Sequence, residues 1–544
     1  MRGLMMDMPL MISAVIQHAA DYHGDTEIVA REIDGSIFRY DYRQAHERCK
    51  RLAQALERLG VARGQRVGTL AWNTHRHFEM FYGVPGMGAV LHTVNPRLYR
   101  EQLVYIINHC EDAWMFCDLA ALPLVEDLAA DLETVEGYCI MADEADMPAS
   151  SKLPNLVCYE SLLAAEDGDY QWPEFDEKSA STICYTSGTT GNPKGVVYTH
   201  RALVLQMLAA NASDFIGGYR AGDWEVVMPM SPMFHGNAWN VPFTAAAQGM
   251  KLVLPGRSYE PEMLVELFEQ EEVTFTCGVP TFWLILLEYL GKTGKKLPHL
   301  RASLSSGSAP PRWMVEKLLN EYGVELINTW GMTEALAGSK GSLKPGDAAL
   351  PPEQRMDKLM KSGRGLFGVR HRIVDDDGNQ LPWDGKSRGH FQIKGPWIAS
   401  GYFKAEGGSP LDDEGWLATG DVAVIEPDGY LTLQDRSKDV IKSGGEWISS
   451  VEIENLAVGH PDILQAAVIG VAHPKWQERP LLICVRRPDS EVGRQDMLDY
   501  LRDKLARWWM PDDVQFIDEI PITGTGKIHK IRLRERFKDY VLPS

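Results

Sequence analysis

The chain has 544 residues, of which 44% are hydrophobic and 24% are charged. This composition is close to the globular average and excludes a disordered, collagen-like or disulfide-stapled protein. Because 55 basic side chains stand against 75 acidic ones, the formal charge is −20. That balance argues against a non-specific nucleic-acid or anionic-membrane surface, since both are bound through basic patches. A small anionic ligand stays compatible with it, because a local cluster of lysines and backbone N–H groups can outweigh the net charge.

The first part of the chain alternates helix-like and strand-like segments. Apolar residues at three- and four-residue spacing predict a helix over 44–59, with Gly60 as its C-cap, and further helices over 75–88 and near 100–109. The strand-like runs are 66–72, 89–94, 113–118, 251–254, 274–279, 302–307 and 324–330. Repeated strand–helix–strand order with short connections predicts an α/β fold of doubly wound parallel sheets covered by helices.

The texture changes in the last third of the chain. Short strands and turn-forming residues over 369–434 predict a small β subdomain. Beyond it, helical patterns over 450–459 and 494–507 alternate with strands over 465–472 and 481–486. We therefore expect a compact α+β domain to begin near residue 437.

Cysteine usage and the N-terminus bear on the compartment. The eight cysteines are scattered without a Cys-x-x-Cys pair, which favours reduced, buried thiols over a zinc site or disulfide framework. The Met-rich start is interrupted by Asp7 and Pro9 and carries no signal-peptide cleavage site, and no window approaches 18 uninterrupted apolar residues. The sequence thus predicts a soluble cytoplasmic protein.

The strongest local signal is YTSGTTGNPKG over 185–195, directly after a strand-like run. Its glycines and hydroxyl residues make a flexible, donor-rich loop that can wrap phosphate oxygens, and Lys194 adds a positive charge. The alternative is an ordinary Ser/Thr/Gly surface turn, which the closing Pro-Lys-Gly disfavours. The spacing of a Walker A loop is absent.

Three other glycine patterns are weaker. GRGLFG (363–368) matches a dinucleotide fingerprint, but neither a strand before it nor a helix after it is predicted. GKSRG (385–389) matches a nucleophile elbow, yet it lies in a polar turn before a strand. GTGK (524–527) lacks the first glycine and the final hydroxyl of a Walker loop. We therefore reject a dinucleotide site at the first and interpret the second as an ordinary hairpin loop.

Five motifs in order carry a family resemblance. They are YTSGTTGNPKG (185–195), NTWGMTE (328–334), GWLATGD (415–421), DRSKDVIKSGGEWIS (435–449) and PITGTGKIHK (521–530). Together they resemble the adenylate-forming superfamily of acyl-CoA synthetases, adenylation domains and luciferases, over nearly the whole chain. SPMFHGNAWNVPF (231–243) and KSGGEWISS (442–450) are similar to the medium- and long-chain fatty acyl-CoA synthetase branch, and within it most to ligases of 3-methylmercaptopropionate.

The resemblance implies a two-step reaction that needs ATP, Mg²⁺ and CoA. A carboxylate first attacks the α-phosphorus of ATP and expels pyrophosphate, which supplies AMP as a leaving group for the thiol of CoA. In the family, the position of Lys527 bridges the carboxylate and the α-phosphate, where two anions must approach each other. Thr333 would contact the α-phosphate, and Glu334 would ligate Mg²⁺. The residues implied for the β- and γ-phosphates are Thr186, Ser187, Gly188, Thr189, Thr190 and Lys194.

Further residues are implied for the nucleoside and the acyl group. Asp421 would accept the ribose hydroxyls, and Arg436 would approach the ribose and phosphate. The adenine would lie between Trp330 and the 307–310 segment. The remaining residues implied for this nucleotide pocket are Gly307, Ser308, Ala309, Gly331 and Met332.

The acyl pocket is implied around residues 235–239. His235 would lie at its carboxylate end without any need to act as an acid or base, Trp239 would gate the acyl channel, and Gly331 would line it. Taken alone, a histidine beside apolar residues is more often a core or surface residue. Trp330 replaces the usual Tyr in its motif, and Gly236-Asn237 replaces Val-Asn, so a chain-length preference does not carry over.

The second step needs a different geometry, because CoA must reach the carbonyl that Lys527 guarded. The family rotates its C-terminal domain about a hinge, and Lys438 matches the pivot position. This implies an N-terminal domain over 1–434, a hinge over 435–439 and a mobile domain over 440–544. Gly444 and Gly445 would line the pantetheine tunnel. Trp476 would lie near the CoA nucleotide, although a half-buried surface aromatic explains it nearly as well.

The sequence therefore predicts an AMP-forming acid–thiol ligase for a short or medium aliphatic acid, with 3-methylmercaptopropionate as the specific hypothesis. The alternatives are a medium- or long-chain fatty acid–CoA ligase, an enzyme that acylates a carrier protein and a luciferase-like oxygenase. An alternative of another class is a catalytically idle acyl-nucleotide binding protein, against which the presence of Lys527, Glu334 and Asp421 weighs. The resemblance is compatible with a homodimer.

Overall fold

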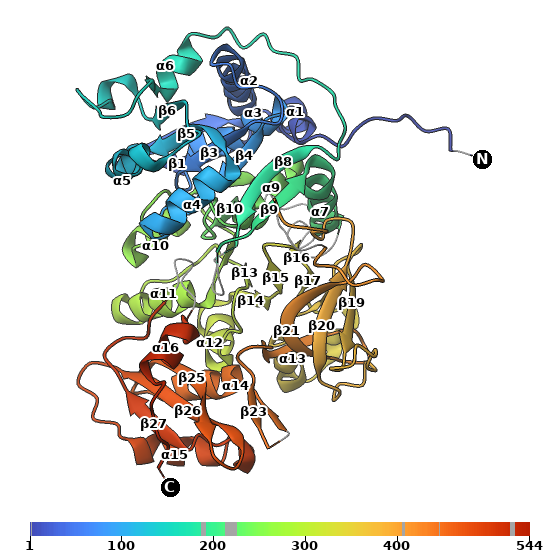
Figure 1. Cartoon of the computed structure of the whole chain (residues 1–544), viewed down its shortest axis with the longest axis vertical. Coiled ribbons are helices and arrows are strands. Elements are labelled where there is room, and N and C mark those ends of the chain that lie inside the picture. Colours follow the sequence, from blue (N-terminus) through green and yellow to red (C-terminus); the bar gives the residue numbers. More distant parts are fainter. Residues whose placement is uncertain are drawn as a thin grey trace.

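The computed structural model describes residues 1, 3–186, 192–212, 226–404, 409–444, 446–522 and 528–543. Two seven-stranded sheets form the larger part of the molecule (Figure 1). The first contains, in spatial order, β14 (Glu325–Asn328), β13 (Ala302–Ser305), β12 (Phe275–Gly278), β10 (Val226–Pro229), β11 (Lys251–Leu254), β1 (Glu27–Arg31) and β2 (Ile37–Asp41). The second contains β7 (Leu156–Cys158), β6 (Gly137–Met141), β5 (Asp112–Asp118), β3 (Arg66–Leu70), β4 (Val90–Thr93), β8 (Ala180–Tyr185) and β9 (Gly195–Thr199).

Neighbouring strands in both sheets are parallel, except for one antiparallel edge pair in each, β1–β2 and β8–β9. The predicted α/β class with parallel sheets is confirmed, and the predicted strand over 251–254 matches β11. A parallel strand needs a crossover helix to return the chain, which accounts for the helices on the sheet faces. Those that follow strands are α4 (Arg100–Cys110), α5 (Leu122–Leu128), α6 (Tyr159–Ala164), α10 (Pro261–Gln270), α11 (Pro280–Thr293), α12 (Arg312–Tyr322) and α13 (Pro352–Leu359).

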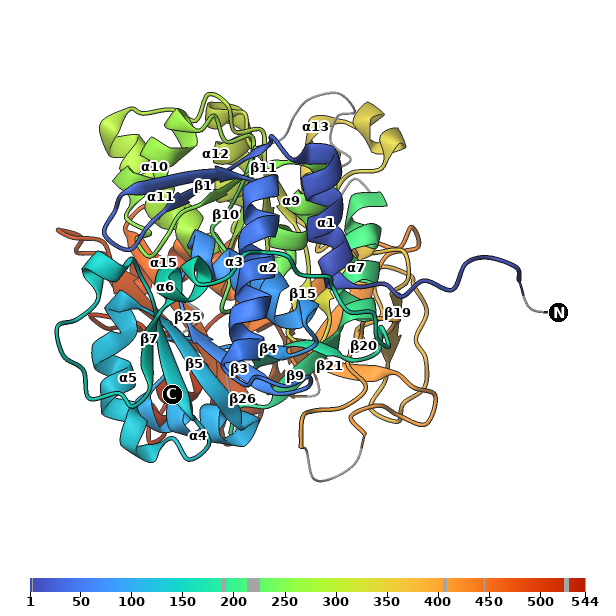
Figure 2. The ribbon, with the colours of Figure 1, turned by 90° about the horizontal axis from the view of Figure 1, so that it is seen from above.

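Helices lie between the two sheets (Figure 2). They are α1 (Ile12–His23), α2 (Tyr42–Arg58), α3 (His75–Gly86), α7 (His200–Ala212) and α9 (Val241–Gln248). α3 contacts β1 of one sheet and β4 and β8 of the other. Its Tyr82 is buried and donates a hydrogen bond to the carbonyl oxygen of Pro242 at 3.0 Å. The main hydrophobic core is therefore shared by both sheets.

The predicted β subdomain is a four-stranded antiparallel sheet. It consists of β19 (Arg370–Val374), β20 (Gly389–Lys394), β21 (Leu417–Ile425) and β22 (Leu431–Arg436). Two short antiparallel strand pairs lie between it and the larger sheets in the chain. They are β15 (Gly331–Met332) with β16 (Leu336–Ala337), and β17 (Ser339–Lys340) with β18 (Arg364–Gly365). No helix opens after the 363–368 glycines; that segment contains β18 and the turn that follows it. Residues 385–388 form a polar bend before β20, as expected.

The C-terminal sheet lies at one end of the molecule (Figure 1). Its strands are β24 (Glu446–Ile448), β23 (Ile441–Ser443), β26 (Gln477–Arg486), β25 (Ile463–His473) and β27 (Asp513–Phe516), covered by α14 (Ser450–Val458), α15 (Arg494–Arg502) and α16 (Lys530–Arg536). The helix predicted over 494–507 ends earlier, at Arg502. The chain turns there, and Leu505 and Trp509 are buried in the C-terminal core. Within the described part of the chain, no helix has the length and apolarity needed to cross a membrane.

Candidate active site

The predicted phosphate loop is closed at its neck by hydrogen bonds between its two ends. β8 ends at Tyr185, and β9 begins at Gly195 on the antiparallel neighbour. The amide of Thr186 donates to the carbonyl oxygen of Lys194 at 2.9 Å, and the amide of Lys194 donates to Oγ1 of Thr186 at 3.1 Å. The loop thus starts at the carboxyl end of β8, where α/β sheets bind ligands. Its predicted phosphate ligands Ser187, Gly188, Thr189 and Thr190 lie outside the described residues.

Tyr402 connects this neck to Glu334. The Nζ atom of Lys194 lies 4.7 Å from the centre of the Tyr402 ring, a cation–π distance. The Tyr402 hydroxyl donates to Oε1 of Glu334 at 2.8 Å. Glu334 is only 7% exposed, and among the described residues Tyr402 is the side chain that donates to its carboxylate. Its second oxygen can therefore bind a hard cation, which fits a magnesium ligand.

Thr333 and Glu334 lie in the tight turn between β15 and β16. The amide of Ala335 donates to the carbonyl oxygen of Met332 at 2.9 Å, and Leu336 has a left-handed φ of 52°. The Tyr198 hydroxyl donates to the carbonyl oxygen of Thr333 at 2.5 Å. Because Tyr198 is on β9, this bond ties the turn to the strand that follows the phosphate loop.

Trp330, Asp421 and Arg436 form one cluster, in which Trp330 and Asp421 are buried and the side chain of Arg436 is 43% exposed. The indole Nε1 of Trp330 donates to Oδ2 of Asp421 at 2.9 Å, and Nε of Arg436 lies 3.0 Å from Oδ1. The ring of Trp330 meets Phe391 edge to face at 4.9 Å, and a Cβ on Gly338 would lie 2.3 Å from it. Both oxygens of Asp421 thus have a cationic or N–H donor, and this arrangement fixes the carboxylate.

The other residues predicted for the nucleotide lie at neighbouring strand ends. The amide of Thr329, after β14, donates to the carbonyl oxygen of Ser305 at the end of β13 at 2.9 Å. This pairing brings the segment after β13 beside Trp330. That segment contains Gly307, Ser308 and Ala309, and Gly331 and Met332 form β15 directly after Trp330.

Residues 236–240 form a left-handed helical turn, directly after His235, whose backbone is extended. Gly236, Asn237, Ala238, Trp239 and Asn240 all have positive φ, between 48° and 66°. L-residues disfavour this conformation by about 1–2 kcal/mol each. The turn between His235 and Asn240, which contains Trp239, is thus of the opposite hand to an ordinary α-helix.

Asn237 holds the turn against the strand that leads to the phosphate loop. Its side-chain amide is fully buried and donates to Oγ1 of Thr182 at 3.0 Å. The Cys184 thiol donates to Oδ1 of Asn237 at 3.5 Å. Trp239 is half-buried against the main core. Gly236 stands where the long-chain pattern has Val. With Asn237 it belongs to a stretch of positive φ, which glycine and asparagine adopt more readily than valine.

The residues predicted for CoA lie in the C-terminal sheet. Gly444 has a φ of +60°, and a Cβ there would lie 3.0 Å from Trp476 and 3.3 Å from Trp508. The two indoles meet edge to face with their ring centres 4.9 Å apart, and the amide of Gly444 donates to the carbonyl oxygen of Trp476 at 3.0 Å. Lys438 lies in the exposed turn between β22 and β23. Gly445 and Lys527 lie outside the described residues.

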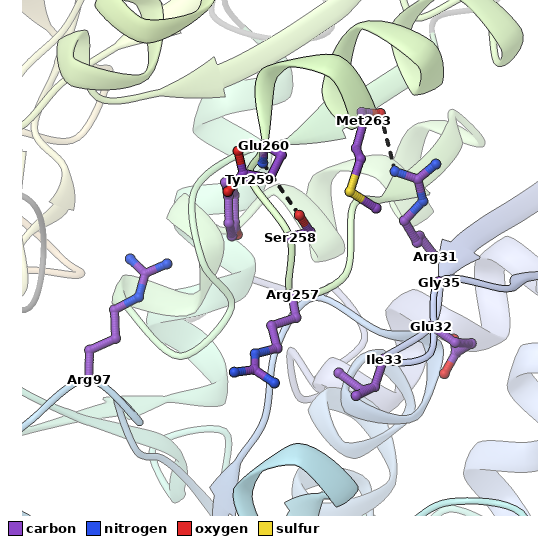
Figure 3. Close-up of a pocket in the computed structure, with 10 residues that line it drawn as sticks. All are labelled: Arg31, Glu32, Ile33, Gly35, Arg97, Arg257, Ser258, Tyr259, Glu260 and Met263. Atoms are coloured by element: carbon purple, nitrogen blue, oxygen red, sulfur yellow. Dashed lines mark hydrogen bonds between the residues drawn. The ribbon is translucent and has the colours of Figure 1, made fainter.

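Three arginines line a pocket of about 390 Å³ that no sequence motif indicated (Figure 3). Arg97 lies 4.9 Å from the ring centre of Trp72 and 5.9 Å from that of Phe234, the residue before His235. Arg31 is paired with Glu266, whereas Arg257 is exposed. The arginines come from positions 31, 97 and 257, so no local motif could have predicted this juxtaposition.

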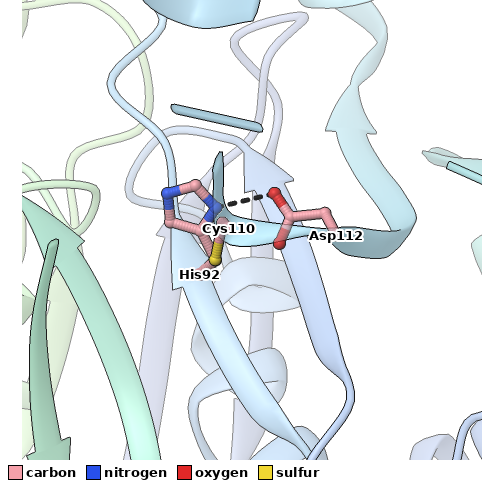
Figure 4. A group of neighbouring side chains, drawn as sticks. All are labelled: His92, Cys110 and Asp112. Atoms are coloured by element: carbon pink, nitrogen blue, oxygen red, sulfur yellow. Dashed lines mark hydrogen bonds and ion pairs between the residues drawn. The ribbon is translucent and has the colours of Figure 1, made fainter. Parts of the chain in front are cut away.

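A second missed feature lies behind the phosphate loop, where His92, Cys110 and Asp112 are fully buried together (Figure 4). Nδ1 of His92 lies 2.7 Å from Oδ2 of Asp112, and one ligand atom from each residue lies within 4.8 Å of the others. The ring of Tyr185, the first residue of the loop motif, lies 5.0 Å from His92. Burial raises the pKa of the Cys110 thiol, so this sulfur is a neutral thiol next to the His–Asp pair.

Comparison with known proteins shows to which family the chain belongs. The model of the AMP-binding enzyme family matches residues 16–403, and that of the AMP-binding enzyme C-terminal domain matches residues 452–527. The chain belongs to the AMP-binding enzyme family. Over 540 residues, 99% of both chains, it is 46% identical to the 3-methylmercaptopropionyl-CoA ligase of Ruegeria lacuscaerulensis. It is 43% identical over 545 residues to the medium-chain-fatty-acid–CoA ligase of Ectopseudomonas oleovorans, covering 100% of this chain and 99% of that one.

Solved structures show the same fold. The anthranilate CoA ligase AuaEII in complex with anthranoyl-AMP superposes with a TM-score of 0.85 over 98% of both chains, at 23% identity. The predictions of an AMP-forming acyl-CoA synthetase and of its need for ATP, Mg²⁺ and CoA are confirmed by the family and the CoA-ligase relatives. The roles of individual residues in this AMP-binding enzyme stay predictions.

Proposed function

We propose that this acyl-CoA ligase activates a short or medium aliphatic acid and that 3-methylmercaptopropionate is its substrate. The observation that carries this proposal is the 46% identity, over 99% of both chains, with a ligase named for that thioester product. A second relative with the same name, from Ruegeria pomeroyi, is 45% identical over 540 residues. A medium- or long-chain fatty acid is the second candidate, since ligases with those names reach 43% identity.

In the first half-reaction, a carboxylate oxygen of the acid attacks the α-phosphorus of ATP, and the bond to the pyrophosphate leaving group breaks. Lys527 is proposed to bridge the two anions, and Lys194 and Thr186 to hold the outer phosphates with the residues of the loop. The hydrogen bonds that close the loop neck support this assignment, because they preorganise donors for the developing charge. A magnesium ion held by Glu334, when bound, would neutralise phosphate charge.

The nucleoside is proposed to lie against the Trp330 wall, with its ribose hydroxyls on Asp421. The support is that Asp421 is 5% exposed and its carboxylate is fixed by Trp330 and Arg436, so its orientation is set before the nucleotide arrives. Thr333 is proposed to contact the α-phosphate. The turn that carries Thr333 is tied to β9 by Tyr198, which supports a fixed distance from the phosphate loop.

The acyl group is proposed to extend from His235 past Trp239. Fixed backbone in the left-handed turn supports this, because a strained conformation held by buried hydrogen bonds is a mark of functional sites. Aliphatic and thioether tails both suit an aromatic gate, since sulfur makes favourable contacts with ring edges.

In the second half-reaction, the thiol sulfur of CoA attacks the acyl carbonyl carbon, the bond to AMP breaks, and the thiol proton is lost to solvent. We propose that Gly444, Gly445 and Trp476 line the path of the pantetheine. Arg97 and Arg257 are proposed to attract the phosphates of CoA, since a guanidinium fork matches phosphate geometry. The position of Arg97 beside Phe234, which precedes His235, supports this assignment.

We further propose that residues 440–544 form a mobile domain that rotates about the 435–439 hinge at Lys438. The separate match of the C-terminal family model, over 452–527, supports a distinct unit. A homodimer and a cytoplasmic location are carried over from the sequence as proposals. Sedimentation of the purified chain and fractionation of the producing cells test them.

The deciding experiment measures pyrophosphate, AMP and acyl-CoA formation over a series of acids from acetate to octanoate, including 3-methylmercaptopropionate, with and without CoA. The proposal expects the highest kcat/KM for 3-methylmercaptopropionate and a thioester product identified by mass. A preference for octanoate over it would favour the fatty-acid candidate. Pyrophosphate release that needs no CoA would favour acyl transfer to a carrier protein, and no release with any acid would favour an idle binder. Lys527→Ala serves as the control that should lose adenylate formation.

A further inference from the structure

The end of β22 is hydrogen-bonded to the start of α14 across the proposed hinge. Oδ2 of Asp435 accepts from the amide of Ser450 at 2.7 Å and from its hydroxyl at 2.5 Å. The hydroxyl of Ser449, the N-cap of α14, donates to the carbonyl oxygen of Gln434 at 2.5 Å. Asp435 is 5% exposed and Ser450 is fully buried. These three bonds are therefore shielded from solvent.

The partners in these bonds lie on opposite sides of the proposed pivot, Lys438. On the N-terminal side, Asp435 is paired with Val422 of β21 and belongs to the β subdomain. On the other side, Ser450 is the first residue of α14 in the C-terminal unit. A rotation of that unit about the backbone bonds of Lys438 carries α14 away from β22. The bonds can therefore form in one orientation and must break in the other.

α14 is fixed within the C-terminal unit and moves with it. Glu454 on this helix accepts from the amide of Val468 on β25 at 2.7 Å, and it lies 2.7 Å from Nζ of Lys530 on α16. Lys530 also donates to Oγ of Ser450 at 2.5 Å. Because that oxygen accepts from Lys530, the hydroxyl proton of Ser450 is directed at Asp435.

The Asp435 carboxylate is well placed at the N-terminus of α14. The first N–H groups of a helix have no partner within it, and the helix dipole favours negative charge there. Ser449 accepts from the amide of Glu452 at 3.2 Å, and Asp435 accepts from that of Ser450. Hydrogen bonds to a charged acceptor are stronger than those between neutral groups. The contact therefore favours the orientation in which it forms.

Arg388 makes a second contact across the pivot, at the surface. Its Nη1 donates to the carbonyl oxygen of Trp447 at 2.9 Å, and its guanidinium lies 5.0 Å from the ring centre of Trp509. Arg388 precedes β20 of the β subdomain, whereas both tryptophans belong to the C-terminal unit. Because Arg388 is exposed, its side chain can be removed without opening a core.

α16 shows which side of the C-terminal unit is turned toward the phosphate loop. This helix follows the loop that contains Lys527, and Nη2 of its Arg532 donates to the hydroxyl of Tyr99 at 2.8 Å. Tyr99 follows β4, the parallel neighbour of β8, and the phosphate loop starts at the end of β8. The part of the unit next to Lys527 therefore faces that edge of the sheet, as the first half-reaction requires.

We propose that Asp435 is a positioning residue, which latches β22 to α14 and holds the C-terminal unit in the orientation for adenylate formation. The inference rests on the proposed rotation about Lys438. The unit must release Ser450 from Asp435 before CoA reacts, and it regains the bonds for the next turnover. Each half-reaction proceeds at a rate proportional to the population of its orientation. The ratio of the two rate constants therefore follows the equilibrium that the latch sets.

The test compares Asp435→Ala, Asp435→Asn and Arg388→Ala with the wild-type chain. Adenylate formation is followed by rapid quench with ATP and 3-methylmercaptopropionate, without CoA. Thioester formation is followed by mixing the preformed acyl-adenylate complex with CoA. Arg388→Ala leaves the backbone next to Arg436 untouched, so it separates an effect of the latch from one on the proposed ribose contact.

Each variant has a matched control whose contacts stay within one unit. Asp41 also caps a helix, since it accepts from the amide of Gln44 at the start of α2 at 2.8 Å, so Asp41→Ala is the control for Asp435→Ala. The guanidinium of the exposed Arg370 lies 5.4 Å from the ring centre of Trp416 in the same subdomain. Arg370→Ala is therefore the control for Arg388→Ala.

We expect Asp435→Ala to lower the ratio of the adenylation to the thioester rate constant by about tenfold, which corresponds to about 1.4 kcal/mol. Asp435→Asn keeps an acceptor and should lower it less, Arg388→Ala should lower it by about twofold, and both controls should leave it unchanged. The proposal is overturned if Asp435→Ala leaves the ratio unchanged or raises it, or if Asp41→Ala lowers it as much. If Asp435→Ala does not fold, an unchanged ratio in Arg388→Ala overturns it.

A distance measurement separates the latch from the proposed function. All eight native cysteines are buried, so spin labels can be attached to Lys178→Cys and Lys504→Cys, at exposed positions in the two units. Pulsed dipolar spectroscopy then reads the label distances without substrates. Asp435→Ala should enrich a second distance relative to the latched background, and an unchanged distribution overturns the proposal. If the wild-type chain performs neither half-reaction, the proposed function fails, and the distances still decide on the latch.

Discussion

The indole nitrogen of Trp330 donates a 2.9 Å hydrogen bond to Oδ2 of Asp421, across 91 residues of sequence. The bond makes Trp330, the proposed wall of the nucleotide site, and Asp421, the proposed ribose ligand, one structural unit. Hydrogen bonds to charged groups contribute about 1.5–3 kcal/mol, more than those to neutral acceptors.

Trp330→Phe removes this donor and keeps an aromatic ring. We expect the free energy of unfolding to fall by about 1.5–3 kcal/mol and the KM for ATP to rise, because Asp421 loses the indole donor that orients its carboxylate. Trp397→Phe is the control, since its Nε1 donates to the neutral carbonyl oxygen of Ala337 at 3.2 Å. Its loss should be nearer 1 kcal/mol. Equal losses in urea unfolding for the two variants would contradict the assignment.

Tyr402→Phe should weaken the response to magnesium. The Tyr402 hydroxyl orients the Glu334 carboxylate at 2.8 Å, so without it the carboxylate samples other rotamers before the metal arrives. We expect the magnesium concentration at half-maximal pyrophosphate release to rise by about tenfold. Tyr198→Phe removes a hydroxyl that binds the backbone of Thr333 and not a carboxylate, so its magnesium response should stay near wild type. A magnesium titration that does not separate the two variants would count against Glu334 as the ligand.

Gly444→Ala should act on the second half-reaction. Its φ of +60° costs an L-residue about 1–2 kcal/mol, and the new Cβ would meet Trp476 at 3.0 Å. We expect thioester formation to slow by about tenfold while pyrophosphate release without CoA is unchanged. Gly493→Ala lies in the same unit with a φ of −106° and should affect neither step. Loss of both half-reactions in Gly444→Ala would show a general folding defect instead.

His75 makes stability depend on pH. Burial acts to lower its pKa, but hydrogen bonds to Glu160 and Glu32, the latter at 2.6 Å, outweigh burial and raise it above 6.5. The stabilisation from this group is therefore complete below about pH 6.5 and is lost as pH rises through the folded-state pKa. His75→Gln should cost about 3 kcal/mol at pH 6 and progressively less at higher pH.

The control for this pH profile is His77→Gln. Burial lowers the pKa of His77 to about 4, so its ring is neutral in the folded and unfolded states above pH 6.5. The difference in unfolding free energy between His77→Gln and wild type should therefore stay constant from pH 7 to 9. A His75→Gln difference that is equally flat over that range would refute the raised pKa.

Local sequence patterns predicted most of the helices and strands of the two large sheets. Periodicity and glycine placement predicted the helix over 44–59, which the structure has as Tyr42–Arg58 because Asp41 caps it through a hydrogen bond from Gln44. Predictions were weaker where long-range packing decides: the 494–507 helix stops early so that Leu505 and Trp509 can be buried.

In the candidate site, too, local motifs could be predicted and long-range contacts could not. Trp330 and Asp421, from two of the motifs, are hydrogen-bonded to each other, and Thr333 lies in the turn after Trp330; their roles stay predictions. The residues that hold them, such as Tyr402 against Glu334, are 68 positions apart and belong to no shared pattern. Arg97 and Arg257 meet in one pocket for the same reason: a tertiary contact between distant segments has no periodicity that a single sequence can display.

The left-handed turn over 236–240 has an evolutionary consequence. Each position in it restricts which side chains the backbone can accept, and Asn237 and Asn240 are further committed by buried hydrogen bonds to Thr182 and Gln206. Single substitutions within the turn are therefore costly, so new acyl preferences should arise by mutation in the walls that surround it. The turn is then inherited as a unit, while substitutions accumulate in the residues around it.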